Sequence, residues 1–239
     1  MTGRNPLAEG VRKTAHRIRR LGPAAPFIEQ AAQRGLVFLH VGCGPLLVPK
    51  WINCDVLTLA DPDGRATTAG EAYELRGSLY IHIDPARPYP VPDGKVAWVY
   101  SEHLIEHLSL RAGLAWLREM RRVLTQGGRI RISTPDLEQF SRGYLDKSRA
   151  LLTQWRQDLI EYGESKSTPA RPAFLFNTLM RSWGHQYLYD FAEMSTLLTH
   201  AGFANVVRQT YRNGQDAALA KLDQKIRSAG NLYVEATKP

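Results

Sequence analysis

The stretch LVFLHVGCG, residues 36–44, decides the fold of this chain. It begins with a short, largely apolar run that includes β-branched and aromatic residues, and it ends in a glycine-x-glycine turn. A short apolar run bounded by a turn is typical of a strand buried on both faces of a parallel sheet. Glycines let the backbone bend sharply and approach a bound group closely. The stretch therefore predicts a buried strand that leads into a ligand-binding turn.

A second apolar stretch, residues 51–56, follows the turn and carries Asp55 near its end. Open α/β sheets bind nucleosides with this arrangement: the glycine backbone meets the cofactor, and the acid accepts hydrogen bonds from ribose hydroxyls. Only residues 45–50, two of them prolines, separate the turn from the second stretch, so there is no room for a full helix. Pyrophosphate binding relies on the N-terminus of such a helix. We therefore expect a nucleoside ligand without a phosphate at this point, rather than a dinucleotide.

The composition fits one large α/β domain with insertions. The chain has 239 residues, of which 44% are hydrophobic, enough for an ordinary core. No apolar run approaches the ~18–20 residues that span a bilayer, and no apolar segment of a secretory signal follows the basic N-terminus. Two cysteines, Cys43 and Cys54, are too few for a disulfide framework and, by themselves, for a zinc site. We expect a cytoplasmic protein.

The positive charge is concentrated at the N-terminus. Of the net charge of +8, residues 1–22 carry +5, because they hold six basic residues and one acidic residue. Apolar residues recur at three- and four-residue steps from Leu7 to Leu21, which predicts an amphipathic helix with a basic face. A second helix is predicted from Pro26 to the residue before Gly35.

We call residues 1–35 the basic arm and residues 36–239 the main domain. The high pI reflects the arm and does not indicate a nucleic-acid surface on the main domain. Two roles for the arm stay open: a solvated helix packed on the domain, or a peripheral contact with anionic lipid at the inner face of the membrane or with an acidic partner.

Strand and helix patterns alternate along the main domain. Further strands are predicted at 79–83, 96–100, 129–133, 203–209 and 232–236, and helices at 68–76, 109–124, 190–201 and 216–228. This alternation indicates a mostly parallel sheet with right-handed connections. Residues 136–182 interrupt it, and we expect them to form a helical insertion, or lid, over the carboxyl edge of the sheet, where ligands bind in such folds.

Five segments in order carry a resemblance to a known family: LHVGCGPLLVPKWINCDV (39–56), YSEHLIEHL (100–108), LREMRRVLTQGGRIRISTPDLE (117–138), HQYLYDFAEMSTLLTHAGF (185–203) and LYVEATK (232–238). In these segments the chain resembles class I S-adenosylmethionine-dependent methyltransferases. It is most similar to the methyltransferase type 11-like, small bacterial group often found beside glycosyltransferases. The resemblance implies a Rossmann-like seven-stranded sheet, mostly parallel with an antiparallel last strand. It also implies S-adenosyl-L-methionine across the carboxyl ends of strands one to four.

The resemblance assigns roles to eight residues. The turn residues Gly42, Cys43 and Gly44 would line the methionine and ribose, Asp55 would accept the ribose hydroxyls, Asp84 would sit near the adenine amino group, and Ser101, Glu102 and His103 would face the sulfonium and the acceptor. Two positions depart from the family pattern: His40 replaces the acid before the turn, and Leu46 replaces the third glycine. These departures favour an alternative in which the chain is a binding or accessory module without catalysis.

Methyl transfer to a hydroxyl needs an in-line arrangement of donor and acceptor and a base within hydrogen-bond reach. His103, at the end of the fourth strand, is our first candidate base, and the alternative is a histidine that shapes the cofactor site. His185, after the insertion, is the second candidate, and its alternative is a buttress of the loop. We therefore predict O-methylation of a hydroxyl on a sugar, a glycan or another small-molecule acceptor.

Other activities fit the sequence less well. The order H-x-x-E-H from His103 to His107 occurs in inverted zinc peptidases, but here it follows a strand of a nucleoside-binding fold and no separate glutamate ligand is evident. We predict no metal ligands. A nicotinamide oxidoreductase would need the helix after Gly44 and a third glycine. An amino-methyltransferase of nucleic acids would carry an Asn/Asp-Pro-Pro-aromatic motif where this chain has residues 101–103.

Overall fold

The computed structural model describes residues 11–13, 17–33, 37–44, 46–85, 87–161, 163–225 and 228–239. Its strands are β1 (Val11–Lys13), β2 (Arg19–Pro23), β3 (Val37–Val41), β4 (Ile52–Asp55), β5 (Thr58–Ala60), β6 (Glu71–Leu75), β7 (Ser78–His82), β8 (Val96–Glu102), β9 (Leu124–Pro135), β10 (Ala204–Gln209) and β11 (Asn231–Thr237). Its helices are α1 (Ala24–Gln33), α2 (Leu110–Val123), α3 (Leu137–Leu145), α4 (Ala150–Glu161), α5 (Pro172–Arg181), α6 (Phe191–His200) and α7 (Ala217–Ala220), with short 3-10 helices η1 (Ile105–His107) and η2 (Ser182–Gly184).

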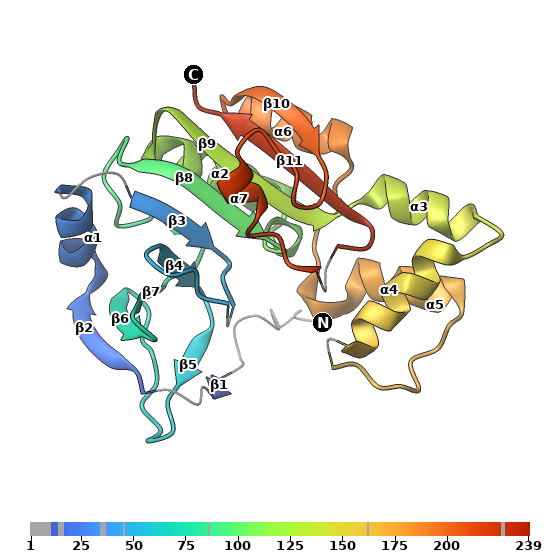
Figure 1. Cartoon of the computed structure of the whole chain (residues 1–239), viewed down its shortest axis with the longest axis horizontal. Helices are drawn as coiled ribbons and strands as arrows, with labels where there is room; N and C mark the ends of the chain where they lie inside the picture. The colour runs from blue at the N-terminus through green and yellow to red at the C-terminus, as the bar shows by residue number, and fades with distance from the viewer. Residues whose placement is uncertain are drawn as a thin grey trace.

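The main sheet contains the predicted seven strands and two more. Its order is β10-β11-β9-β8-β3-β4-β7-β6-β2 (Figure 1). The five strands from β9 to β7 run parallel, and β11 is antiparallel to both of its neighbours. This confirms the predicted mostly parallel α/β sheet with an antiparallel last strand. The hairpin partner β6 and the N-terminal strand β2 extend the sheet beyond β7 as an antiparallel edge.

The two faces of the sheet are covered differently. One face packs its apolar residues, such as Leu39 and Ile130, into the main core with α1, α2 and α6. Side chains alternate along a strand, so His40, Tyr100 and Arg131 lie on the opposite face. Residues 210–225, which include α7, cover the end of that face over β8, β9 and β11 (Figure 1).

Two predictions are confirmed, one for the connection after β3 and one for the helical insertion after β9. No helix forms among residues 46–51, so β3 connects directly to β4. Helices α3, α4 and α5 build the insertion beyond the carboxyl ends of β8 and β9 (Figure 1). They enclose a small apolar core of their own, which includes Phe140, Leu152 and Leu175. Figure 1 also shows this unit projecting from one end of the sheet.

Among the residues that the structure describes, two predicted helices are wrong and a third is shorter than predicted. The helix predicted from Leu7 to Leu21 gives strands β1 and β2 instead, because the open edge of β6 offers backbone hydrogen-bond partners to residues 19–23. Residues 1–10 and 14–16 of that prediction, and Gly35 at the end of the next one, lie outside the described residues. The division of the chain at residue 35 stays a prediction.

The helix predicted at 68–76 is strand β6. Arg76 and Gly77 both have positive φ, +55° and +69°, and connect β6 to β7 as a two-residue hairpin turn. Such turns match the twist of antiparallel strands. The helix predicted at 216–228 is shorter than expected: α7 covers only Ala217–Ala220 among the described residues. Its N-cap, Asp216, accepts hydrogen bonds from the second and third residues of the helix.

Candidate active site

The glycine turn after β3 folds back onto β4. The N–H groups of Gly42 and Cys43 donate hydrogen bonds to the carbonyl of Cys54 over 2.9 and 3.1 Å. Gly42 has φ +72°, and a Cβ built on it would lie 2.9 Å from the Cβ of Leu104. The backbone conformation and the contact both require glycine. The turn is thereby held between β4 and the segment that follows β8.

Asp55 ends β4 and holds the other side of this turn. Its Oδ2 accepts a hydrogen bond from the N–H of Gly44 at 2.6 Å, and its Oδ1 accepts one from Leu57 at 2.9 Å. Burial raises the pKa of Asp55, and the backbone hydrogen bonds oppose that effect. A carboxylate oxygen accepts more than one hydrogen bond, so ribose hydroxyls can share both oxygens. The structure therefore brings the turn and the acid together, as the sequence predicts.

Asp84 lies at the adjacent strand end. It follows β7 by two residues and is exposed. The N–H of Ile83 donates to the carbonyl of Asp55 at 2.8 Å, which ties the end of β7 to the end of β4. Gly42, Asp55 and Asp84 thus share one edge of the sheet, and their contacts with a cofactor stay a prediction.

A cavity of about 260 Å³ opens beside the turn. Its walls include Gly42, Cys43, Glu102, His40 and Tyr100. The covering segment adds Lys221, Leu222 and Gln224. Gly44, Asp55, Asp84 and Ser101 do not line it. Ser101 is buried, and strand alternation turns its side chain to the face opposite Glu102. The cavity therefore adjoins three of the seven predicted cofactor residues.

The two departures from the family pattern both border this cavity. His40 is buried, and its ring lies 5.2 Å from the ring of Tyr100. Its Nδ1 is 3.2 Å from Oδ1 of Asn53. Leu46 is 42% exposed at the same wall. An imidazole therefore stands where the family pattern has a carboxylate.

His103 occupies a strained position at the end of β8. Its φ is +52°, uncommon for a residue other than glycine. Nδ1 lies 3.0 Å from Oε1 of Glu106, and Nε2 lies 3.0 Å from the side-chain nitrogen of Asn231. In the neutral imidazole, Nδ1–H donates to the carboxylate and Nε2 accepts from the amide. A carboxylate thus orients the ring and leaves Nε2 as the proton acceptor, the arrangement of a general base.

Glu106 is fully buried and remains ionised at neutral pH. Burial alone would raise its pKa, but the hydrogen bond and charge of His103, with the charges of His107 and His185, lower the pKa of Glu106 to about 2. Its Oε2 accepts a hydrogen bond from the hydroxyl of Thr134 at 3.0 Å. The carboxylate is therefore a fixed negative charge behind His103.

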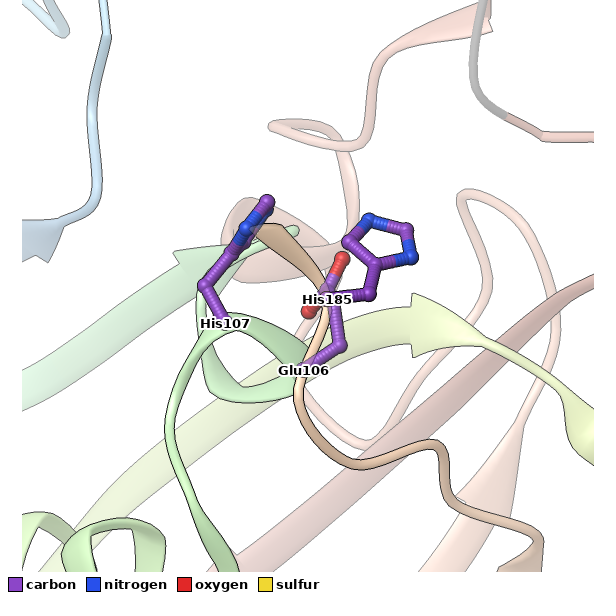
Figure 2. Close-up of side chains that lie close together, drawn as sticks. All are labelled: Glu106, His107 and His185. Atoms are coloured by element: carbon purple, nitrogen blue, oxygen red, sulfur yellow. The ribbon is translucent and has the colours of Figure 1, made fainter. Parts of the chain in front are cut away.

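His185 joins the same cluster from the far end of the insertion. Its ring centroid lies 4.8 Å from that of His107, and its Nδ1 donates to the carbonyl of Leu179 at 2.6 Å. Figure 2 shows the carboxylate of Glu106 between the two imidazole rings. Burial lowers the pKa of His107, and the nearby charges of His185 and His103 lower it further, against the opposing charge of Glu106. Both predicted bases, His103 and His185, thus gather around one buried carboxylate.

Sequence reasoning missed Glu106, Thr134 and Asn231 as parts of this site. The available signal for Glu106 was its place beside His107 shortly after a predicted strand. From the sequence alone, that pair is interpreted as structural and not as part of the active site. Asn231 lies 128 residues from His103 and Thr134 lies 28 residues from Glu106. No local pattern indicates such contacts.

The profile of a family described as a methyltransferase domain matches residues 39–132. No curated protein matches the chain. A solved structure described as that of a possible exported protein of Bordetella parapertussis has 15% identity and a TM-score of 0.49, and the alignment covers 90% of this chain and 67% of that one. The S-adenosylmethionine-dependent methyltransferase SibL has 17% identity and a TM-score of 0.46, with 90% and 54% covered.

A methyltransferase of Archaeoglobus fulgidus, also described as S-adenosylmethionine-dependent, has 12% identity and a TM-score of 0.46, with 90% and 94% covered. The chain thus spans about half the length of SibL and nearly all of the Archaeoglobus protein. The identities are low and these TM-scores lie below 0.5. The evidence for a methyltransferase is therefore the match of the methyltransferase-domain family to residues 39–132.

Proposed function

We propose that the chain is an S-adenosylmethionine-dependent methyltransferase that methylates a hydroxyl of a sugar, a glycan or another small acceptor, because residues 39–132 match a methyltransferase-domain family. S-Adenosyl-L-methionine is the methyl donor. The observation that carries the proposal is the pairing of His103 with the buried carboxylate of Glu106. His103 lies between Glu102, which lines the cavity, and Leu104, which touches Gly42. A base in this position serves a hydroxyl acceptor.

The proposed reaction is a single displacement. The acceptor oxygen attacks the methyl carbon, the carbon–sulfur bond breaks, and S-adenosylhomocysteine leaves as a neutral thioether. The hydroxyl proton passes to Nε2 of His103, and the fixed charge of Glu106 stabilises the imidazolium that forms. In this structure the side-chain amide of Asn231 contacts Nε2 of His103, so the acceptor hydroxyl displaces or shares this contact. The turn residues, Asp55 and Glu102 hold and orient the donor.

The acceptor class is supported by the resemblance to methyltransferases found beside glycosyltransferases. Mass spectrometry with isotope-labelled donor and a panel of sugars, sugar nucleotides and lipid-linked glycans tests it. A gain of one labelled methyl on a glycan hydroxyl supports the proposal, whereas transfer only to nitrogen or carbon acceptors contradicts it. Binding of S-adenosylhomocysteine without turnover on any acceptor favours the alternative of a non-catalytic module.

Replacing Asp55 with asparagine is expected to weaken S-adenosylhomocysteine binding by about 10–100-fold, because hydrogen bonds to a charged acceptor contribute about 1.5–3 kcal/mol. Isothermal titration calorimetry measures the affinity, and thermal melting reports the fold. Asp61→Asn is the matched control, since Asp61 is a buried acid that accepts backbone hydrogen bonds from Arg65 and Ile18 but lines no part of the cavity. Unchanged affinity in a folded Asp55→Asn protein would exclude Asp55 from the cofactor site.

We also propose that the basic arm contacts anionic lipid. Among the described residues, no helix has the length and apolar character to cross a bilayer. Arg19 and Arg20 pair with Glu74 and Glu71 at the surface of the sheet edge, so these two cations are partly neutralised. Arg17 likewise lies 3.9 Å from a carboxylate oxygen of Asp63, so the proposal depends on the remaining basic residues of the arm: Arg4, Arg12 and Lys13.

A variant with Arg4, Arg12 and Lys13 replaced by glutamine is expected to bind anionic vesicles about 100-fold more weakly, since each basic residue near such a surface contributes about 1 kcal/mol. Co-sedimentation with vesicles containing phosphatidylserine measures the affinity. The matched control replaces Arg142, Lys147 and Arg149 of the insertion and removes the same charge. Equal losses in both variants would mean that the arm has no special role at the lipid surface.

A further inference from the structure

Glu106, His107 and His185 form a cluster whose ligating atoms all lie within 4.8 Å of one another (Figure 2). Two of its members come from η1, directly after β8, and the third follows η2, after the insertion. Glu106 and His107 are buried and His185 is half-buried. From this geometry we propose that the cluster binds one divalent transition-metal ion, Zn²⁺, for which Co²⁺ and Ni²⁺ can substitute.

The donor set determines the class of ion. Two imidazole nitrogens and one carboxylate oxygen suit zinc, cobalt and nickel, whereas Mg²⁺ and Ca²⁺ take oxygen ligands. Zinc binds nitrogen and oxygen donors at about 2.0–2.2 Å, so tetrahedral ligand atoms lie roughly 3.4 Å apart. Donors within 4.8 Å of one another need to close by up to about 1.4 Å, which rotations of the side chains supply. Three protein ligands leave a fourth position open for water or an acceptor oxygen.

The surroundings of the cluster orient its donors. Nδ1 of His185 donates to the carbonyl of Leu179, so its Nε2 keeps the lone pair for a metal. Metal-binding histidines are commonly fixed in this way. Thr134 donates to Oε2 of Glu106 and His103 lies against Oε1, and each oxygen retains a further lone pair. These contacts keep the carboxylate ionised and in place.

The two parts of the cluster are joined by hydrogen bonds. The N–H of Gln186 donates to the carbonyl of Glu106 at 2.7 Å, and the side-chain amide of Gln186 donates to the carbonyl of His107 at 2.7 Å. His107 is only 7% exposed, and its Nδ1 has no hydrogen-bond partner within the described part of the chain. Burying such an atom unpaired is unfavourable. The site is thus preassembled and includes an imidazole that hydrogen-bonds the backbone of Trp183 but has no partner for its Nδ1 among the described residues.

The order His-x-x-Glu-His from residue 103 to 107 did not predict this set of ligands. His103 pairs with Glu106 through a hydrogen bond and stays outside the cluster, and the third donor comes from residue 185. Metal binding at the cluster is independent of the acceptor proposed above. Metal binding is measured without the methyl donor and without a methyl acceptor. Failure of one proposal therefore leaves the other standing.

Calorimetric titration of chelator-treated protein with Zn²⁺ tests the proposal. We expect one ion per chain, and a loss of affinity of about 100-fold or more in His185→Ala, since even outer contacts of a metal site contribute about 10–100-fold. Co²⁺ serves as the second probe, because it gives visible absorption bands that report its coordination. His200→Ala is the matched control: His200 is exposed at the end of α6, and its removal is expected to leave the affinity unchanged.

Two results would overturn the proposal. One is no stoichiometric uptake of Zn²⁺ or Co²⁺ at micromolar metal, and the other is equal affinity in the wild type and in folded His185→Ala. Where circular dichroism shows that His185→Ala fails to fold, X-ray absorption spectroscopy of the zinc-loaded wild type decides. Two imidazole ligands in that spectrum support the cluster, and one or none refutes it.

Discussion

Arg131→Met is expected to lower the free energy of unfolding by about 3–5 kcal/mol, the cost of leaving buried charges without their partner. Arg131 is fully buried on β9 between Asp223 and Glu235, which are also buried. Burial alone would lower the pKa of Arg131, but the hydrogen bonds and charges of these two acids raise it above its usual value. The variant leaves both carboxylates in the interior without their cation.

Loss of Arg131 is expected to affect the cavity as well as stability. The guanidinium also donates to the carbonyls of Thr210 and Asn213, so it holds the segment 210–225 on the sheet. Lys221, Leu222 and Gln224 of that segment form one wall of the cavity. Weaker S-adenosylhomocysteine binding should therefore accompany the loss of stability.

Chemical and thermal unfolding measure this effect. A loss of about 3–5 kcal/mol corresponds to a fall in Tm of roughly 6–20 °C for a chain of this length. Combining Arg131→Met with Asp223→Asn and Glu235→Gln should restore part of the stability, because it removes the uncompensated charges. Arg142→Met is the control: its ion pair with Glu138 is exposed, and we expect no measurable change. A loss below about 1 kcal/mol in Arg131→Met would show that the buried triad does not anchor the segment.

His103→Asn is expected to reduce kcat by about 10²–10⁴-fold, the usual contribution of a general base. Asparagine suits this test because it tolerates positive φ better than most residues, and His103 has φ +52°. The variant removes the proton acceptor Nε2 while keeping a polar side chain near Glu106. Affinity for S-adenosylhomocysteine should stay within about threefold of the wild type, a difference of less than about 1 kcal/mol.

The labelled-donor assay on the acceptor identified by mass spectrometry measures kcat, and calorimetry measures cofactor affinity. His200→Asn, on the exposed end of α6, is the control for histidine loss. Full activity in His103→Asn would exclude His103 as the base and leave His185 as the candidate. Parallel losses of activity and cofactor affinity would instead indicate that His103 shapes the donor site.

Much of the fold follows from patterns along the chain. The apolar run before Gly42, the short connection to β4 and the alternation of later strands and helices give the parallel sheet, because each pattern reports which side of an element is buried. The ends of adjacent parallel strands lie side by side, so the turn and Asp55 could be placed together from the sequence alone. The helices predicted at 109–124 and 190–201 form and are capped by Ser109 and Asp190, because capping depends on neighbours within a few residues.

Some elements were decided by partners that local patterns do not reveal. Residues 19–23 and 71–75 have periodicities compatible with helices, but each forms a strand because a neighbouring strand edge satisfies its backbone hydrogen bonds. Strand β2 pairs with β6, about 50 residues further along the chain, whereas β6 also pairs with β7 through a two-residue turn.

The sequence by itself determined the type of sheet, the glycine turn after β3 and the acid beside it, since these depend on short spacings. Only the tertiary structure brought His185 to Glu106 and His107, Asn231 to His103, and Asp223 with Glu235 to Arg131. The physical reason is that buried polar groups must find partners, and any segment that packing brings near can supply them. Those partners lie up to 128 residues away along the chain. Neither periodicity nor motif spacing gives a signal over that separation.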